Sequence, residues 1–405
     1  MKKTCLAVIL ICAALQPYCQ KFTISGTVTS AKSGETIIGA TIRSVESHVG
    51  IVSNEYGFYS LTLPAGSYHI EASAIGLLQM SFSVGLYHDT TVNILLEDEV
   101  KTLQGVTVTT SSSGGRSLAS SQMGVEHITT KEINNIPVLF GEKDVLKTIQ
   151  LLPGIKSAGD GNSGFYVRGG ALDQNLILLD EAPVYNASHL LGFFSTFNSD
   201  AIKDVTVYKG GMPAQYGGRL SSVVDVKMNE GNNKDYHVSG GIGLISTKLN
   251  IEGPIQEDKS SFLITARRTY ADLFLKLSKD STVNQDKLYF YDLNAKLNYI
   301  LGKKNRLYIS GYFGRDVLGA AQTFGLDWGN GTGTMRWNHI FNSRLFANTS
   351  LIFSNYNYKI SVKSGADNFD IFSQIRDLNF KEEFQWYPNS RNSVRFGVNS
   401  IYHTI

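Results

Sequence analysis

Apolar and polar residues alternate along the C-terminal half of the chain, most clearly in residues 344–360. One face of that segment carries Leu345, Ala347, Thr349, Leu351 and Phe353, and the other mostly carries Asn348, Ser350, Ser354 and Tyr356. A period of two residues predicts a β-strand with one apolar and one polar face. Residues 289–299, 306–313, 377–387 and 394–402 follow the same pattern less regularly.

Turn sequences separate these predicted strands. Residues 302–305, 342–343 and 388–391 predict tight turns, and the stretches near 272–287, 315–332 and 361–375 predict long connections. Short and long loops that alternate between strands of ten or more residues are typical of an outer-membrane barrel. We count eight or nine antiparallel strands in residues 231–405, depending on whether residues 240–254 fold back on themselves.

Residues 1–20 have the pattern of a secretory signal peptide. Lys2 and Lys3 precede an apolar core at residues 5–15, and Pro17 breaks the segment. All cysteines of the chain lie in this segment, at positions 5, 12 and 19. Residues 21–405 therefore offer no disulfide and no thiolate metal site.

Residues 21–97 predict a small β-sandwich, because short alternating segments recur with turn signals about every ten residues. Residues 98–125 predict a linker that is rich in Ser, Thr and Gly and poor in large apolar residues. Within it, residues 105–110 alternate Val and Thr. This β-prone piece is either a free strand that adds to the sheet edge of a partner or the last strand of the sandwich.

Residues 126–230 predict a small α+β domain of short apolar strands separated by glycine turns. Val145, Ile149 and Leu152 have helical spacing, and Pro153 and Gly154 end that helix. The apolar strand at residues 175–179 runs into an Asp-Glu pair, which suggests either a turn or acid–base chemistry.

Composition argues against several classes of function. The formal net charge is +2 and 18% of the residues are charged, which gives no reason to expect a nucleic-acid partner. The histidines are scattered and no nucleophile elbow is present, so we expect no metal site, no cofactor and no catalytic residue. Residues 159–164 fit the G-x-G-x-x-G pattern, but they lack the strand before and the helix after that dinucleotide binding needs.

The motif order in residues 131–230 resembles the plug domain of TonB-dependent outer-membrane receptors. The resemblance rests on the helix and its following Leu-Pro-Gly-Ile, on Val-Arg-Gly at residues 167–169, and on the glycine turns at 210–211 and 217–218. Residues 22–97 resemble the carboxypeptidase-regulatory-like domain through IGATI at 38–42 and SNEYGFY at 53–59. That domain precedes the plug in receptors of Bacteroidetes-type bacteria.

The resemblance implies a mostly β chain. A signal peptide (1–20), a sandwich (21–97), a linker (98–125) and a plug domain (126–230) would precede a partial transmembrane β-barrel (231–405). A barrel that holds such a plug needs about 22 strands. We therefore expect an N-terminal fragment with further strands beyond Ile405.

The resemblance also implies a function. The receptor would bind a scarce, bulky nutrient and import it into the periplasm by energised displacement of the plug, without covalent chemistry. Its partners would be a TonB-type energy-coupling protein, outer-membrane lipid, and a siderophore, cobalamin, oligosaccharide or peptide. The longer signature of the SusC-type subfamily is missing, which puts a SusD-like lipoprotein partner in doubt. The location would be the cell outer membrane, with the sandwich and linker in the periplasm. The alternative is a non-transporting outer-membrane adhesin or assembly scaffold.

Candidate site residues follow from the resemblance. Those of the TonB box are Val106, Thr107, Val108 and Thr109. Arg168 and Arg219 are expected to anchor the plug to carboxylates of the barrel wall, because a charge in a polar lumen needs a partner. The candidate ligand contacts are Asp160, Asn162, Tyr185 and Trp328, the last in the long loop after Asp316. Asp180 and Glu181 are expected to form a structural turn.

Overall fold

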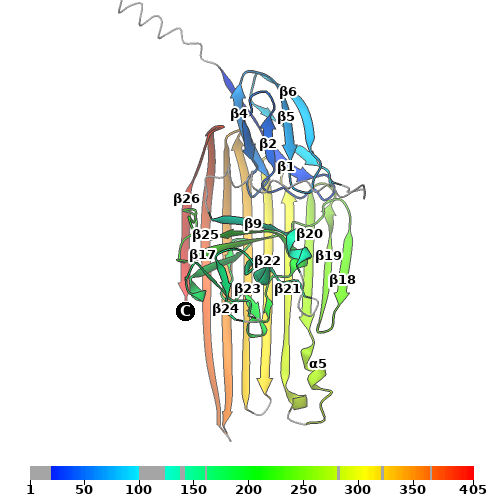
Figure 1. Cartoon of the computed structure of the whole chain (residues 1–405), viewed down its shortest axis with the longest axis vertical. Coiled ribbons are helices and arrows are strands. Elements are labelled where there is room, and N and C mark those ends of the chain that lie inside the picture. The colour runs from blue at the N-terminus through cyan, green and yellow to red at the C-terminus, as the bar shows by residue number, and fades with distance from the viewer. Residues whose placement is uncertain are drawn as a thin grey trace, which may run out of the picture.

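The computed structural model describes residues 20–99, 124–136, 142–159, 162–280, 283–320, 323–364 and 367–405. Figure 1 shows three parts. A small β-domain caps one end of a sheet of long strands, and a mixed α/β domain lies across the middle of that sheet. Segment α5 (Ala271–Leu275) lies at the opposite end of the long strands.

The N-terminal domain is a sandwich of two four-stranded sheets, as predicted. One sheet contains β1 (Lys21–Ser30), β4 (Phe58–Pro64), β7 (Thr90–Thr91) and β8 (Ile94–Leu96). The other has the order β3 (Gly50–Val52), β2 (Thr41–Ser44), β5 (Gly66–Ser73) and β6 (Met80–Leu86). Ile24, Ile42, Leu61, Ile70 and Ile94 are fully buried between them. Burying one apolar face of each sheet is what stabilises such a pair.

The middle domain is built on a five-stranded sheet. Its order is β13 (Ala182–Pro183), β12 (Asn175–Leu179), β17 (Ser222–Met228), β16 (Ile202–Tyr208) and β9 (Val125–Thr129). Only β12 and β17 pair in parallel within it. Two small hairpins complete it: β10 (Ile155–Ser157) with β11 (Phe165–Val167), and β14 (Ser188–His189) with β15 (Phe194–Ser195). Short 3₁₀ turns lie at η1 (Leu172–Gln174), η2 (Leu190–Gly192) and η3 (Ser199–Ala201).

Two short helices pack on this sheet. The predicted helix is α4 (Val145–Ile149), shorter than its apolar spacing suggested, and the Asp144 side chain caps it by accepting from the Lys147 amide. The other is α3 (Thr130–Asn135), which starts with a capping box between Thr129 and Glu132. Ile149 is fully buried in the core of the domain.

The C-terminal half forms one antiparallel sheet of nine sequential strands. They are β18 (His237–Ile242), β19 (Ser246–Gln256), β20 (Ser260–Thr269), β21 (Lys287–Ile300), β22 (Asn305–Ala320), β23 (Phe324–Asn342), β24 (Leu345–Ser364), β25 (Asp367–Asn389) and β26 (Asn392–Thr404). Residues 240–254 do fold back on themselves, which decides between eight and nine. The fold class predicted from the sequence is therefore confirmed.

The predicted tight turns are confirmed, but two predicted long loops are wrong. Residues 301–304, 343–344 and 390–391 join adjacent strands closely. Residues 272–287 do form a long connection, with α5 and η4 (Val283–Gln285). Residues 315–332 and 361–375, in contrast, lie mostly within β22 to β25, whose register continues to Ala320↔Phe324 and to Ser364↔Asp367. Backbone pairing with the neighbouring strand holds most of both stretches extended, although the first is glycine-rich and the second is mainly polar.

The two faces of the long sheet differ in chemistry. On β24, Leu351 and Phe353 are 48% and 40% exposed, whereas Asn348, Ser350 and Ser354 are fully buried beneath the middle domain. The alternation in the sequence predicted this division. Among the described residues, no helix is long and apolar enough to cross a membrane.

Candidate functional site

The middle domain meets the sheet at a two-residue turn between β12 and β13. Asp180 and Glu181 occupy this turn with φ angles of 46° and 75°, and Leu179 pairs with Ala182 on either side. Two consecutive left-handed residues give the tight hairpin turn that matches the twist of its strands. The predicted turn thus has the expected place, but both of its carboxylates are buried against the sheet.

Three cations of the sheet surround this pair of carboxylates. The Lys296 ammonium of β21 lies 2.8 Å from Asp180, and the Arg336 guanidinium of β23 lies 3.6 Å from Glu181. The Lys381 ammonium of β25 lies 3.9 Å from Glu181. Each of these cations comes from a different strand, so the turn is tied to the sheet across three strands.

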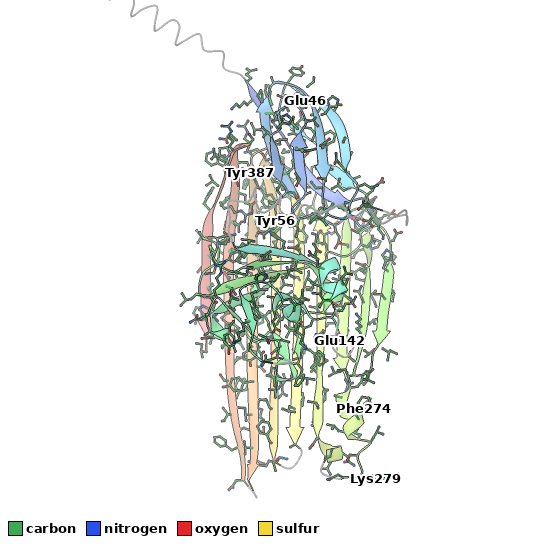
Figure 2. The ribbon with its side chains drawn as sticks, in the orientation of Figure 1. Glu46, Tyr56, Glu142, Phe274, Lys279 and Tyr387 are labelled. Carbon is green, nitrogen blue, oxygen red and sulfur yellow. The ribbon has the colours of Figure 1, made fainter. Side chains whose placement is uncertain are left out.

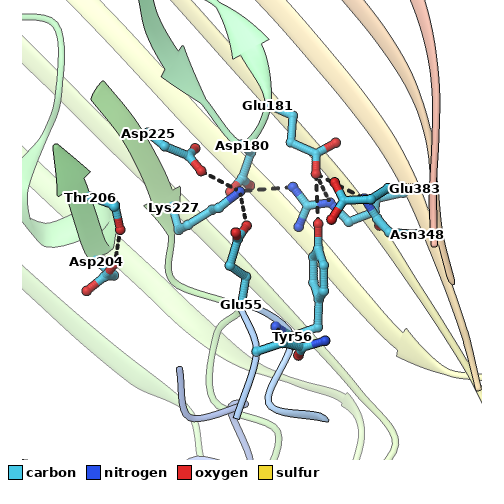
Figure 3. A network of polar contacts seen from close by, with 12 residues as sticks. Glu55, Tyr56, Asp180, Glu181, Asp204, Thr206, Asp225, Lys227, Asn348 and Glu383 are labelled. Atoms are coloured by element: carbon cyan, nitrogen blue, oxygen red, sulfur yellow. Dashed lines mark hydrogen bonds and ion pairs between the residues drawn. The ribbon is translucent and has the colours of Figure 1, made fainter. Parts of the chain in front are cut away.

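Hydrogen bonds complete the environment of both carboxylates. The Met228 amide donates to Asp180 at 3.0 Å. The Asn348 side chain donates to Glu181 at 3.1 Å (Figure 3). Burial alone would raise the pKa of Glu181, but Lys381 and Arg336 outweigh it and hold that pKa below its usual value. Lys296 and Arg336 likewise lower the pKa of Asp180 against the effect of burial. Both groups are therefore ionised at neutral pH.

A second buried contact lies at His189 of β14. Its Nδ1 is 2.6 Å from the Asp316 carboxylate of β22, and its Nε2 is 3.4 Å from Asp292 of β21. The ring stacks on Phe290 at 4.0 Å between centroids. Burial alone would lower the pKa of His189, but the two carboxylates outweigh it and raise that pKa. The two carboxylates thus favour the protonated form of an imidazole that lies against two strands of the sheet.

Arg267 of β20 extends this second contact. Its guanidinium lies 2.7 Å from Asp292 and donates to the Ser195 carbonyl at 2.9 Å. It also lies 3.4 Å from Glu142 and over the Phe290 ring at 5.0 Å. The sheet therefore holds the middle domain through cations as well as carboxylates.

The predicted anchors do not take part in these contacts. Arg168 is exposed, its guanidinium lies beside Gly124 and Gly210, and it makes no ion pair among the described residues. Arg219 donates to the carbonyl of its neighbour Gly218. The expected polarity is reversed at the β12–β13 turn, where the middle domain supplies carboxylates and the sheet supplies cations.

The predicted ligand contacts are dispersed. Tyr185 donates its hydroxyl to Asp377 of β25 at 2.6 Å and so adds to the contact with the sheet. Asn162 folds back on its own loop and accepts from the Gly164 amide. The predicted loop position of Trp328 is wrong, because this residue lies in β23 and is only 3% exposed. Asp160 and residues 106–109 lie outside the described residues.

The sequence did contain a signal for the residues that were missed. Three missed cations lie on the polar faces of strands whose residues alternate between apolar and polar, namely Lys296, Arg336 and Lys381. A charge on such a covered face has no access to bulk water. That pattern marks each of them as needing a partner, although it does not identify the partner.

Buried polar contacts thus hold a compact domain against the polar face of the sheet β18–β26, which we call the wall below. Two family models match the chain: the CarboxypepD_reg-like domain over residues 24–108 and the TonB-dependent receptor plug domain over residues 117–224. The first match includes Val106, Thr107 and Val108. The chain thus carries a CarboxypepD_reg-like domain followed by a TonB-dependent receptor plug domain, the two domains that its sequence resembles. We call residues 124–230 the plug from here on.

Solved structures that are similar to this chain include two receptors and one transporter. The ferric enterobactin receptor of Pseudomonas aeruginosa is 14% identical, with a TM-score of 0.48, over 66% of this chain and 46% of that one. The siderophore receptor PirA of Acinetobacter baumannii is 16% identical, with a TM-score of 0.46, over 65% and 45%. The outer membrane transporter YddB of Escherichia coli is 13% identical, with a TM-score of 0.49, over 69% and 48%. The matches span less than half of each of these proteins. No curated protein matches the chain.

Proposed function

We propose that the chain is part of an outer-membrane receptor that imports a scarce, bulky nutrient by displacement of its plug. The observation that carries this proposal is the polar interface between plug and sheet. The plug has an apolar core made almost entirely of its own residues, which include Ile149, Val167, Val205 and Val224. Tyr312 of the sheet also packs in this core. The contacts to the sheet are mainly ion pairs and hydrogen bonds.

Such an interface supports a movable plug. When both partners of a buried ion pair become hydrated together, the recovered solvation offsets much of the lost attraction. Separation of two apolar surfaces would instead cost roughly 25 cal/mol for each Å² exposed. The plug can therefore leave the sheet with most of its apolar core still buried, since Tyr312 is the one described residue of the sheet in that cluster.

The proposed source of work is a TonB-type protein that pairs with residues 106–109 by strand addition. The sandwich and linker would then lie in the periplasm, and the exposed apolar face of the nine strands would face outer-membrane lipid. The nutrient is a siderophore, cobalamin, an oligosaccharide or a peptide. No covalent bond is made or broken in this proposal, so the protein acts as a transporter and not as an enzyme.

The test is growth and uptake competition on defined iron, cobalamin and glycan sources. A strain with the full-length gene is compared with a knockout and with a deletion of Val106, Thr107 and Val108. Deletion of Ser111, Ser112 and Ser113 is the matched control, because it shortens the same segment equally. We expect one nutrient to fail in the knockout and in the first deletion only.

The opposite result is equally informative. If the deletion of residues 106–108 behaves as wild type for every nutrient, those residues end the sandwich. The scaffold alternative would then replace the transporter.

A further inference from the structure

The sandwich presents one rigid turn to the plug and the sheet. This turn, residues 53–58, joins β3 to β4 and is called the docking turn below. The Asn54 side chain accepts from the amides of Tyr56 and Phe58, both at 2.9 Å, and Gly57 takes a φ of 75°. These local bonds fix the turn before it meets a partner. Its side chains are therefore preorganised for docking.

The docking turn contacts the plug directly. The Tyr56 hydroxyl donates to Glu181 at 2.8 Å, and the Glu55 carboxylate lies 3.3 Å from the Lys227 ammonium of β17. Figure 3 shows both side chains reaching from the sandwich to these groups. One of them thus binds the same carboxylate that Arg336 and Lys381 of the sheet surround.

The same turn also contacts the sheet. The Asn54 amide donates to Gln385 of β25 at 2.9 Å, and Glu55 lies 3.5 Å from Arg395 of β26. The Arg336 guanidinium lies over the Tyr56 ring at 5.4 Å. A single turn therefore bridges the plug and three strands of the sheet.

An apolar cluster adds to these polar contacts. The Tyr56 and Phe58 rings stack on Phe346 of β24 at 5.3 and 5.4 Å, and Phe58 lies 6.0 Å from Tyr387. All four rings are at most 6% exposed. Aromatic pairs of this kind are favourable beyond the area that they bury. Figure 2 places Tyr56 and Tyr387 near the junction of the sandwich and the long strands.

The charge balance of the interface depends on the docking turn. Lys227 has two carboxylates beside it, Asp225 at 3.1 Å and Glu55 at 3.3 Å. Glu55 also pairs with Arg395. Without Glu55, Lys227 would keep Asp225 as its ion-pair partner, and Arg395 would have no ion-pair partner among the described residues. Lys227 and Arg395 outweigh burial and lower the pKa of Glu55 to about 2, so it is charged at neutral pH.

We propose that the docking turn is a latch, which holds the plug against the sheet while the sandwich is docked. The plug then leaves its place only after Glu55 and Tyr56 withdraw from Lys227 and Glu181. The carboxypeptidase-regulatory-like domain thus controls the plug and is not merely a spacer. This inference rests on one part of the proposed function, the displacement of the plug, and not on the import of a nutrient.

The first test measures exposure of the wall beneath the plug in the full-length receptor. Ser310, on the plug-facing side of β22, is 7% exposed and stands in register with Lys296. Ser310→Cys gives a reporter thiol in a chain whose residues 20–405 contain no cysteine. We expect the double variant Glu55→Gln/Tyr56→Phe to raise its labelling rate by about tenfold or more, because it leaves buried partners unpaired.

The matched control is Glu46→Gln with the same reporter. Glu46 is in the same domain and pairs with His69 at the end far from the sheet (Figure 2). This control makes the same Glu→Gln change away from the docking turn, and the labelling rate should stay within about twofold of wild type. Equal labelling in wild type and in the double variant would overturn the latch.

A second test works in the opposite direction. The Ser60 hydroxyl of β4 donates to the Ser343 carbonyl, in the turn between β23 and β24, at 2.7 Å, so these positions join sandwich and sheet outside the docking turn. Ser60→Cys and Ser343→Cys, joined by a short reducible cross-linker, hold the sandwich in place, and we expect nutrient uptake to stop until reduction. Uptake that continues at the uncross-linked rate would refute the latch. If no variant takes up any nutrient but labelling still responds to Glu55→Gln/Tyr56→Phe, the latch stands and the transport proposal fails.

Discussion

The Lys296 ammonium lies 2.8 Å from the Asp180 carboxylate, and the two side chains are only 3% and 2% exposed. Lys296 belongs to the wall and Asp180 to the plug, so this ion pair joins two parts of the molecule that fold around separate cores. A charge buried at such a depth is stable only with its partner. The pair therefore reports directly on whether the plug is seated.

Removal of Lys296 should unseat the plug. Lys296→Met leaves Asp180 buried without its nearest cation, and we expect docking to weaken by about 3 kcal/mol. Hydrogen exchange of the β12 and β17 amides in the full-length protein measures this. The double variant with Asp180→Asn should lose less docking free energy than the sum of the two single changes, because the partners act together.

Lys359→Met is the control: its pair with Asp370 is half exposed and should be worth under about 1 kcal/mol. Equal exchange in the Lys296 and Lys359 variants would contradict the prediction.

Docking of β14 should depend on pH through His189. The docked pKa is raised above its usual value, which is about 6.5. The contribution of the imidazolium is therefore complete below that usual value and is lost as the pH rises through the raised one. The groups that face the ring are Asp316, Asp292 and Tyr312, with Arg267 beside Asp292.

The measurement is a histidine NMR titration of the full-length protein with exchange of the Leu190 amide, which donates to Asp316. We expect that amide to exchange faster, beyond the intrinsic pH effect, as His189 deprotonates. His189→Gln should remove this extra pH dependence. An imidazole that titrates at or below its usual pKa would refute the assignment.

Arg168→Ala should change little. The side chain is exposed and makes no ion pair in the described part of the chain, and exposed substitutions of this kind usually shift stability by under about 0.5 kcal/mol. Labelling of the Ser310→Cys reporter checks this in the same assay as the docking-turn variants. A large increase would restore the prediction that this arginine anchors the plug.

Gly26→Ala should destabilise the sandwich. A Cβ at this position would collide with the carbonyl oxygen of Val92, a backbone atom that cannot move aside freely. Overpacking of this kind typically costs about 2 kcal/mol, visible as a lower melting temperature of the N-terminal domain in the full-length protein. Gly85→Ala is the control, because its Cβ would meet only the Tyr87 ring at an ordinary 3.5 Å. Equal melting temperatures would contradict the prediction.

Much of the fold was predictable because its signals are local. The period of two in residues 344–360 and the turn residues at 302–305 each depend on neighbours a few positions away. They predicted the long strands of the sheet, and local signals of the same kind predicted the sandwich, whereas the plug was identified from the resemblance of its motif order. The composition of residues 315–332 misled, because Gly325, Gly329 and Gly331 favour loops when considered alone. Pairing of Arg315 with Gly329 across the sheet overrode that preference.

The site itself was decided by tertiary structure. Alternation places Lys296, Arg336 and Lys381 on the polar face of the sheet, and the Asp-Glu pair after β12 predicts a turn, so the sequence determined each participant. It did not determine their pairing, since Coulomb attraction depends on distance in space and not on separation along the chain. Only the packing of plug and sandwich against the wall brings Asp180 to Lys296 and Tyr56 to Glu181. The same packing leaves Arg168, the stronger candidate in the sequence, exposed.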